Sequence, residues 1–321
     1  MIHETIVDTI GGTPLVRLSR IHPTGNLVAK VEYMNPGGSI KDRIGLGMIE
    51  RAEEHGWIEP GDTIVEPTSG NTGVGLAMIA AIKGYKLICV MQDKQSKEKQ
   101  DLLRAYGAEV VLCPTDVEPD DPRSYYSVAN ELADRPGHYR PDQYSNPANP
   151  AAHVVSTGPE IWDQTEGKID ILVAGVGTGG TICGTASYLK SMNPNVEVVG
   201  VDPEGSIYTA ESISEVTTYL IEGVGEDFWP ETYDPTVVKR YEMVDDAEAF
   251  AMTRRLAVEE GLLVGGSCGM AVVGALRVAR EHPDRLVVVV LPDSGKSYLS
   301  KIFNDEWMEA NGFPTGTGSD A

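Results

Sequence analysis

One lysine and three glycine-rich segments are the parts of this sequence whose residue types and spacing could do chemistry. Lys41 lies just after a Pro-Gly-Gly-Ser turn, between an apolar strand pattern and the start of a helical pattern. The positive end of a helix dipole disfavours the charged form of an amine, so we expect the pKa of Lys41 to be lowered. A lysine of this kind can bind an aldehyde covalently or abstract a proton.

The first glycine-rich segment, residues 173–181 (VAGVGTGGT), joins a buried strand pattern to a helical pattern. Its backbone amides can converge on an anion at the helix N-terminus, which favours a phosphate group over a plain tight turn. Gly175, Gly177 and Gly180 also match the GxGxxG pattern, and Asp202 ends the next strand pattern. This spacing leaves a dinucleotide-binding loop open as an alternative.

The second segment, residues 66–73 (EPTSGNTG), also lies between a strand pattern and a helical pattern. Capping a helix requires one small polar side chain. This segment supplies four, namely Thr68, Ser69, Asn71 and Thr72. Together with the helix start, they predict a binding site for a second anion, such as a carboxylate.

The third segment, residues 265–269 (GGSCG), contains the GxSxG pattern of a hydrolase nucleophile. A hydrolase of that kind needs an acid and then a histidine further along the chain. The only later histidine is His282, a few residues beyond the segment. We therefore interpret Ser267 as a hydrogen-bond donor, and a helix N-cap remains an alternative role for it.

One cofactor would use all of these parts. Pyridoxal phosphate needs a lysine for its aldehyde, a glycine-rich helix start for its phosphate and a partner for its ring nitrogen. Its amino-acid substrate needs a site for the carboxylate, which the segment 66–73 could provide. A nicotinamide enzyme would explain only the glycine loop at 173–181.

The elements that must position these residues form an alternating pattern. Continuous β-branched runs predict strands buried on both faces, and the helical patterns between them predict parallel sheets covered by helices, the α/β class. The predicted strands are 27–33, 63–66, 86–91, 109–112, 169–174, 196–201 and 286–291. The predicted helices are 42–55, 72–82, 97–106, 150–165, 181–192, 247–259 and 270–280. Residues 117–142 and 207–233 are expected to be long irregular segments, of which the first resembles a surface excursion.

Composition excludes several classes of protein. The chain of 321 residues carries 26 Lys and Arg against 48 Asp and Glu, a net charge of −22, which disfavours binding to nucleic acid or to a membrane surface. The four cysteines are far apart, and neither a disulfide framework nor a metal-binding spacing is present. The first residues lack the basic and then apolar runs of a signal peptide, so we expect a cytoplasmic protein.

From Ile10-Gly-Gly-Thr-Pro-Leu-Val16 to about Phe313, the sequence resembles the cysteine synthase and cystathionine β-synthase family of pyridoxal-phosphate enzymes. This family has the tryptophan-synthase-β-like fold, also called fold type II. Within it, the sequence is most similar to the branch that condenses L-serine with L-homocysteine. The segments that carry this likeness are 142–150 (DQYSNPANP), 200–206 (GVDPEGS), 222–225 (EGVG), 291–294 (LPDS) and 300–308 (SKIFNDEWM).

The resemblance implies a role for each matching residue. Lys41 would bind the cofactor aldehyde and later take the α-proton of the substrate, and Ser267 would face the pyridine nitrogen. The cofactor phosphate would be bound by Gly177, Thr178, Gly179, Gly180 and Thr181. Asn71 would bind the 3′ oxygen of the ring. The substrate carboxylate would be held by Thr68, Ser69, Asn71, Thr72 and Gln143, and the substrate cleft lined by Tyr144 and Gly225.

The implied activity is that of a lyase that condenses L-serine with L-homocysteine to L-cystathionine through an aminoacrylate intermediate. This β-replacement belongs to transsulfuration and cysteine biosynthesis, and a homodimer is expected. The alternatives on the same scaffold are a cysteine synthase that uses O-acetyl-L-serine and sulfide, and a serine or threonine dehydratase. From a different class, a nicotinamide-dependent oxidoreductase stays open because of the GxGxxG match and Asp202.

The resemblance also implies two twisted, mostly parallel sheets flanked by helices, one in each of two domains. Residues 1–40 and 146–315 would form a larger phosphate-binding domain, residues 41–145 a smaller mobile domain for the substrate carboxylate, and residues 316–321 a flexible tail. Heme is not expected, because the first cysteine of this chain is Cys89. Glu226 departs from the family pattern, in which an aromatic residue follows the glycine. Cys268, next to Ser267, is expected to be a small buried filler.

Overall fold

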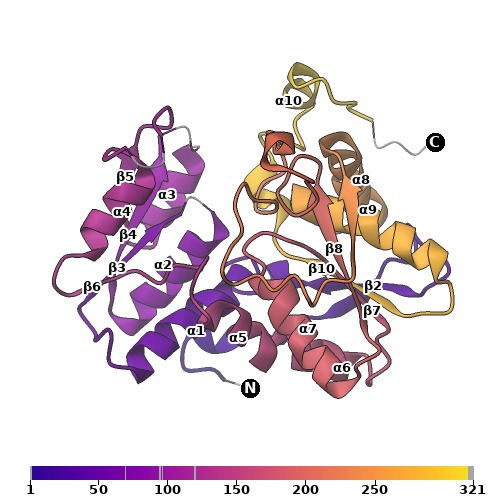
Figure 1. The fold of residues 1–321 in the computed structure, drawn as a ribbon, viewed down its shortest axis with the longest axis horizontal. Helices are drawn as coiled ribbons and strands as arrows, with labels where there is room; N and C mark the ends of the chain where they lie inside the picture. The colour runs from indigo at the N-terminus through magenta and orange to yellow at the C-terminus, as the bar shows by residue number, and fades with distance from the viewer. Residues whose placement is uncertain (1, 69, 94, 96, 119–120, 317–321) are drawn as a thin grey trace.

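The computed structural model describes residues 2–68, 70–93, 95, 97–118 and 121–316. Its larger sheet has six strands in the order β1-β2-β10-β7-β8-β9 (Figure 1). These strands are β1 (Leu15–Arg17), β2 (Leu27–Val31), β7 (Ile171–Gly175), β8 (Glu197–Pro203), β9 (Arg240–Val244) and β10 (Val287–Leu291). Only the pairing of β1 with β2 is antiparallel, and the other four pairings are parallel. The long β-branched runs lie in the centre, where both faces of the sheet are buried.

The smaller sheet has four parallel strands in the order β5-β4-β3-β6, and it lies on the left in Figure 1. Its strands are β3 (Thr63–Pro67), β4 (Lys86–Gln92), β5 (Glu109–Cys113) and β6 (His138–Tyr139). One face is covered by α1 (Lys41–Glu54), α2 (Asn71–Lys83) and α3 (Lys97–Ala105), and the other by α4 (Tyr125–Ala133). Each face therefore has its own apolar core.

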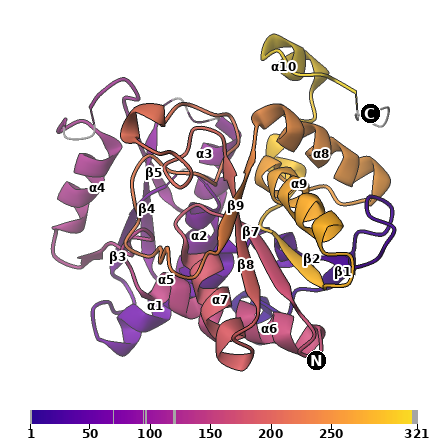
Figure 2. The same cartoon turned by 45° about the vertical axis from the view of Figure 1, so that its right-hand side comes forward.

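Both faces of the larger sheet are covered as well, as Figure 2 shows. One face packs against α8 (Asp246–Glu259), α9 (Gly266–Glu281) and the C-terminal α10 (Asp305–Ala310). The opposite face packs against α6 (Thr157–Gln164) and α7 (Gly180–Met192). Short 3-10 helices span Ile6–Thr9, Glu32–Met34, Ile213–Glu215 and Gly295–Tyr298.

Helix α5 (Ala148–Val155) packs against both α1 and α7, and so connects the helices that follow Lys41 and the glycine loop. Glycines allow this close approach. A Cβ atom on Gly184 of α7 would lie 2.1 Å from the carbonyl oxygen of Pro150, and one on Gly47 of α1 would lie 3.0 Å from Cβ of Ala152. The start of α1 is thus held at a fixed place relative to the start of α7.

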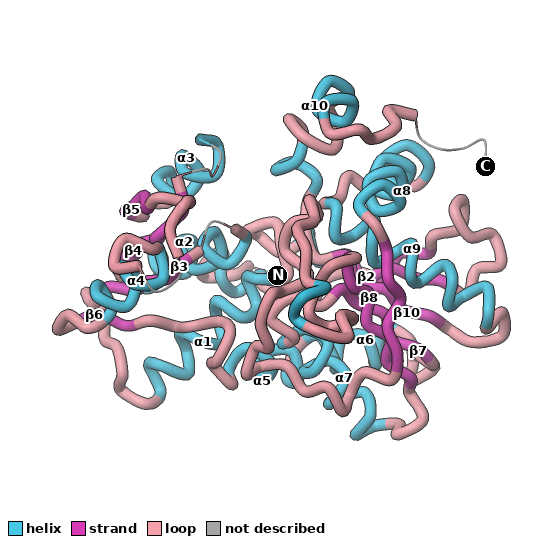
Figure 3. Tube along the Cα trace, turned by 45° about the horizontal axis from the view of Figure 1, so that its top comes forward, coloured by secondary structure: helices cyan, strands magenta, loops and turns pink. Residues whose placement is uncertain are grey.

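The α/β class and the two mostly parallel sheets expected from the sequence are confirmed. The single helix predicted at 150–165 is wrong, because the chain breaks at Ser156 between α5 and α6. Residues 117–142, expected to be irregular, contain α4 and the short β6. Strands β1 and β9 had not been predicted. Residues 207–233 are irregular apart from one 3-10 turn, and they lie between the two sheets (Figure 3).

All four cysteines are buried and unpaired. No helix among the described residues is long and apolar enough to cross a membrane. Most of the predicted tail, residues 317–321, lies outside the described residues.

Candidate active site

Lys41 is the first residue of α1, as predicted, and it is half-buried. Burial lowers the pKa of its amine to about 8, although the nearby negative charge of Glu226 opposes this shift. The turn before Lys41 is fixed against the segment that follows β10. Ile40 N–H donates to the Pro292 carbonyl at 2.8 Å, and Ser39 pairs with Asp293 as an isolated antiparallel bridge.

Asp293 joins the Lys41 turn to two of the other predicted segments. Its buried carboxylate accepts hydrogen bonds from the side-chain amide of Asn71 at 2.9 Å and from the hydroxyl of Tyr298 at 2.8 Å. The Asp293 carbonyl accepts the thiol of Cys268 at 3.5 Å, next to Ser267 in the first turn of α9. The turn before Lys41, the side chain of Asn71 and the residue after Ser267 are far apart in the sequence but are therefore all attached to one short segment.

The predicted phosphate loop lies between β7 and α7. Gly179 has a left-handed conformation with φ of 83°, and no side chain among the described residues caps the helix. The first amides of a helix have no partner inside it, so they are available to an anion. A Cβ atom on Gly180 would lie 1.9 Å from Oδ1 of Asn149, and one on Gly179 would lie 2.6 Å from Cβ of Tyr233. Glycine is required at both positions.

Asn149 and Thr232 connect this loop to the predicted substrate-binding segment. The Asn149 amide donates to the Thr178 hydroxyl at 3.0 Å and to the Gln143 carbonyl at 2.7 Å. The Thr232 hydroxyl donates to the carbonyls of Thr178 at 2.6 Å and Tyr144 at 3.2 Å. A movement of one segment would therefore disturb the other.

The predicted carboxylate-binding residues come together at the start of α2. Thr72 donates a hydrogen bond from its hydroxyl to the side-chain oxygen of Gln143 at 2.7 Å. Thr68 lies nearby, at the end of β3, where it is buried. Ser69, which the sequence also placed here, lies outside the described residues. The carboxylate of Glu66 accepts the backbone N–H groups of Asp142 and Gln143 at 3.0 and 3.3 Å.

Gly225 and Tyr144, the predicted cleft residues, both adjoin Glu226, the first as the preceding residue and the second as a hydrogen-bond partner. The backbone N–H of Gly225 donates to the backbone carbonyl of Val176 at 2.7 Å, and this hydrogen bond fixes the turn to the phosphate loop. Gly225 has φ of 69°, a conformation that side-chain-bearing residues rarely adopt. Tyr144 hydrogen-bonds to the carboxyl of Glu226, which in turn interacts electrostatically with Lys41.

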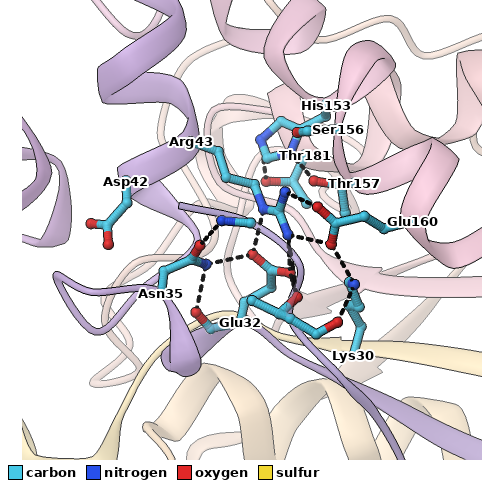
Figure 4. Close-up of polar contacts among 12 residues, drawn as sticks. Lys30, Glu32, Asn35, Asp42, Arg43, His153, Ser156, Thr157, Glu160 and Thr181 are labelled. Atoms are coloured by element: carbon cyan, nitrogen blue, oxygen red, sulfur yellow. Dashed lines mark hydrogen bonds and ion pairs between the residues drawn. The ribbon is translucent and has the colours of Figure 1, made fainter. Parts of the chain in front are cut away.

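A buried ion network supports α1 just beyond Lys41 (Figure 4). The Arg43 guanidinium binds Glu32 at 2.8 Å and Glu160 at 2.7 Å, and Lys30 binds Glu160 at 2.6 Å. These opposite charges hold the pKa of Glu160 down at about 2, even though burial opposes the shift. The network ties α1 to β2 and to α6.

His153 of α5 connects this region to the phosphate loop, because its Nε2 atom lies 3.2 Å from the hydroxyl of Thr181. On the other side of the ring, Nδ1 lies 2.8 Å from the hydroxyl of Thr157. Burial is the main cause that holds the pKa of His153 well below its usual value, and the charges of Arg43 and Lys41 lower it further. The neutral imidazole of His153 is therefore one hydrogen-bond partner of Thr181 in the phosphate loop.

The donor set fits an aldehyde that carries a phosphate ester. It offers an amine with a lowered pKa, a glycine-lined helix start without a capping side chain and the hydroxyl of Ser267 in the first turn of α9. Pyridoxal phosphate has these requirements. Asp202, the residue that would have supported a dinucleotide, is buried and binds the Thr209 hydroxyl at 2.9 Å instead.

Fold and site together define a pyridoxal-phosphate enzyme. Residues 6–293 match the model of the family described as "Pyridoxal-phosphate dependent enzyme", and the chain belongs to this family. Pyridoxal phosphate is therefore its cofactor.

Relatives within the family are similar over almost the whole chain. Cystathionine beta-synthase of Dictyostelium discoideum is 50% identical over 319 residues, which cover 98% of this chain and 64% of that protein. The rabbit (Oryctolagus cuniculus) cystathionine beta-synthase is 50% identical, covering 96% and 58%. A cysteine synthase of Staphylococcus aureus is 45% identical, covering 92% and 96%. This chain thus spans somewhat less than two thirds of these cystathionine beta-synthases.

Solved structures agree with the fold. O-ureido-L-serine synthase superposes with a TM-score of 0.88 at 39% identity, covering 97% of this chain and 100% of that one. A hydrogen sulfide-producing enzyme from Fusobacterium nucleatum superposes with a TM-score of 0.87 at 38% identity, covering 93% and 99%.

Sequence reasoning missed the residues that hold the site together rather than those proposed to touch ligands. Asp293 and Asn149 lie inside segments that the resemblance had marked, 291–294 and 142–150, but nothing in their spacing indicates what they bind. Glu66 had been noted only as the first residue of the segment 66–73, with no role assigned to it. Buried polar residues beside a glycine motif are the signal that could have found them, since a buried polar group requires a partner.

Proposed function

We propose that this protein condenses L-serine with L-homocysteine to L-cystathionine. The observation that carries the proposal is the attachment of the turn before Lys41, of Asn71 and of the first turn of α9 to the single segment 292–294, in a chain 50% identical to cystathionine beta-synthases. Bound pyridoxal phosphate would supply an aldehyde for the substrate amine and a ring that accepts electrons. The reaction would be a β-replacement catalysed by a lyase.

The residues of the chain would then act in order. Asn71, Thr72 and Gln143 orient the substrate through its carboxylate, with Thr68 and Ser69 contributing from the same loop. Lys41 takes the α-proton at Nζ, for which a pKa of about 8 is suitable because a substantial fraction of the amine is neutral near that pH. Gly177, Thr178, Gly179, Gly180 and Thr181 hold the phosphate. Ser267 offers a neutral hydroxyl to the ring nitrogen, which favours β-elimination over transamination.

The same proposal includes the organisation of the chain. Residues 1–40 and 146–315 would act as the larger domain and residues 41–145 as the smaller, mobile one, because the two sheets fall on either side of these boundaries. Closure of the smaller domain, with Tyr144 and Gly225 at the cleft, would exclude water from the reacting groups. We also propose a homodimer located in the cytoplasm.

A cysteine synthase that uses O-acetyl-L-serine and sulfide is the second candidate. It is supported by the Staphylococcus aureus cysteine synthase, which is 45% identical and is covered over 96% of its length. The proposed roles of Lys41, the phosphate loop and the carboxylate site are the same for both reactions.

A competition assay distinguishes the two functions. The holoenzyme receives differently labelled L-serine and O-acetyl-L-serine together with L-homocysteine and sulfide, and mass spectrometry identifies the products. Cystathionine that carries the serine label is expected. Cysteine that carries the acetylserine label as the main product would contradict the proposal and make the protein a cysteine synthase.

Replacement of Lys41 by alanine tests the catalytic core. K41A should lose the absorption band of lysine-bound cofactor and turnover with both donors, because no other amine is proposed to do either task. The matched control is K83A, since Lys83 lies at the end of α2 and pairs with Glu53. Turnover by K41A comparable with that of the unmodified protein would refute the mechanism.

A further inference from the structure

Glu226 is a carboxyl group that the proposed reaction has not used, although it is near enough to Lys41 for their charges to interact. Its charge interacts electrostatically with the Lys41 amine, and its carboxyl is hydrogen-bonded by Tyr144. These two partners come from different parts of the chain, α1 and the segment before α5. Glu226 therefore interacts both with the group proposed to take the α-proton and with a residue proposed to line the substrate cleft.

The backbone around Glu226 is held in place on both sides. Its N–H donates to the hydroxyl of Ser206 at 3.2 Å, and its carbonyl accepts the N–H of Ile207 at 2.9 Å. The preceding Gly225 is bound to Val176 of the phosphate loop. A Cβ atom on Gly177 would lie 2.9 Å from the Gly223 carbonyl, so the loop and this turn are in close contact. The carboxyl group is thus presented from a fixed position.

Several titratable groups surround this carboxyl. Among the described residues, those whose interaction with it is resolved are Lys41 on α1, Asp227 on the same turn, Tyr125 and Tyr126 on α4, Tyr144, and Tyr208 and Tyr219 on the long segment. Burial raises the pKa of Glu226 to about 7, while Lys41 and Tyr144 oppose the shift and Asp227 adds to it. Both the acid and the carboxylate are therefore populated near neutral pH.

We propose that Glu226 is a catalytic acid and base that lets this site use L-serine, whose hydroxyl is a poor leaving group. In the first half of the reaction, Lys41 takes the α-proton, the Cβ–O bond breaks with its electron pair on oxygen, and the Glu226 acid donates its proton so that water leaves. In the second half, the Glu226 carboxylate takes the proton of the incoming thiol while sulfur forms the new bond to Cβ. The α-carbon then regains its proton from Lys41, and both residues return to their starting forms.

The inference rests on the proposed function and makes a statement about the leaving group that can be tested separately. The hydroxyl of L-serine must be protonated to leave, whereas O-acetyl-L-serine releases acetate, which is stable as an anion. Loss of the acid should therefore affect one donor and spare the other.

The test follows the first half of the reaction alone. Holoenzyme is mixed rapidly with L-serine or O-acetyl-L-serine in the absence of thiol, and the absorbance change of the bound cofactor gives the rate. In E226Q, which retains the size and a hydrogen-bond acceptor for Tyr144, the rate with L-serine should fall by about 100-fold or more, while that with O-acetyl-L-serine should change by less than about threefold. In the unmodified protein the serine rate should also fall as pH rises above about 7, and E226Q should lack this dependence.

Two further variants control the experiment. E231Q removes the same charge from an exposed residue further along the same segment, one that does not contribute to the pKa of Glu226, and should leave both rates nearly unchanged. E226D retains an acid and should lose less of the serine rate than E226Q, and it replaces E226Q if that variant fails to retain the cofactor absorption band.

The outcomes are distinct. Equal losses with both donors would overturn the role of Glu226 and leave the proposed function intact. The same conclusion would follow if E226Q retained the serine rate. If the unmodified protein does not react with L-serine at all, the proposed function fails and this inference fails with it.

Discussion

Glu66, one of several buried carboxyl groups around the site, acts on its neighbours through the backbone. It accepts two N–H groups, those of Asp142 and Gln143, and burial raises its pKa to about 7. Asp142 has φ of 53°, a left-handed conformation that is uncommon for residues with a side chain. The two hydrogen bonds to Glu66 hold the chain in this turn, which places Gln143 against Thr72. We interpret Glu66 as a positioning residue.

Replacement of Glu66 by glutamine should therefore weaken substrate binding more than it slows the reaction. A glutamine turns its NH₂ group toward one of the two backbone donors, so a buried hydrogen bond is lost. We expect the KM for L-serine to rise about tenfold with a smaller change in kcat. Steady-state kinetics measure both, and the exposed E59Q is the matched control. A fall in kcat without a change in KM would contradict the positioning role.

At this scale the sequence identified the residue types that could do chemistry but not the residues that orient them. Lys41 was found because a helix start after a glycine turn is visible in the pattern. Asp293 could not be found in the same way, since its partners Asn71 and Tyr298 lie on different elements and only the tertiary fold brings them together.

The close packing of α5 against α1 and α7 is the feature that holds the site at the scale of elements. Asn149, near the start of α5, contacts both the phosphate loop and the segment with Gln143. Its side chain is 1% exposed, so it has no free space into which it could move if a larger residue replaced one of its neighbours. Gly180 is the neighbour at which an added Cβ atom would come closest to the Asn149 side chain.

Replacement of Gly180 by alanine should thus weaken cofactor binding. The added methyl group would lie 1.9 Å from Asn149 Oδ1, and overpacking of this kind typically costs about 1–3 kcal/mol. We expect the dissociation constant for pyridoxal phosphate to rise about tenfold or more in G180A. Absorbance titration of the cofactor-free protein measures this constant.

A double-mutant cycle separates the clash from other effects. N149A should itself weaken binding, because it removes two hydrogen bonds, but it also makes space for the methyl group. The double variant G180A/N149A should therefore bind more tightly than the sum of the two single effects predicts. If the effects of the two substitutions on the binding free energy simply add, the methyl group of G180A does not act through a clash with Asn149.

Elements with strong periodicity were predicted from the sequence within a few residues, and those without it were not. Strand β10, a continuous run of valines, is an example of the first kind. Strand β9 alternates charged and apolar residues at the sheet edge and gave no clear signal. The break between α5 and α6 could not be predicted, because Ser156 interrupts the helix with φ of −130° while the apolar pattern continues on both sides.

At the scale of the whole molecule, the two sheets are joined by contacts that cross between them. Glu222, on the long irregular segment, forms ion pairs with both Lys99 of α3 and Lys301 near the C-terminus. The α/β class was predictable from the alternation of strands and helices, whereas the division into two sheets was expected from the family resemblance. The path of residues 207–233 between the sheets was not, because this segment has no periodicity from which its contacts could be inferred.

Stability should fall as pH rises from about 4.5 to 7. Burial raises the pKa values of Asp42, Glu66, Asp202 and Glu226 to about 7. A carboxyl group whose pKa is higher in the folded state contributes stability at low pH, and this contribution is lost as pH rises through the folded value. Glu160 acts in the opposite direction, but only below about pH 4.5, since its folded pKa is about 2.

Urea denaturation at several pH values, followed by circular dichroism, tests this expectation. The free energy of unfolding should be highest near pH 4.5 to 5 and lower at about pH 7 and above. E160Q should be less stable than the unmodified protein at pH 6, and the difference should shrink toward pH 3 as the advantage of the ion network disappears. A free energy of unfolding that increases steadily up to pH 8 would contradict the role assigned to the buried acids.

The burial of all four cysteines has a consequence for a protein proposed to handle thiols as substrates. Burial raises the pKa of Cys89 to about 12 and that of Cys183 to about 11, and it raises the pKa values of Cys113 and Cys268 as well. Thiol–disulfide exchange requires a thiolate that solvent and reagents can reach. The sulfur atoms of the fold are therefore isolated from the sulfur chemistry of the proposed reaction, and mixed disulfides with homocysteine should not accumulate on the native protein.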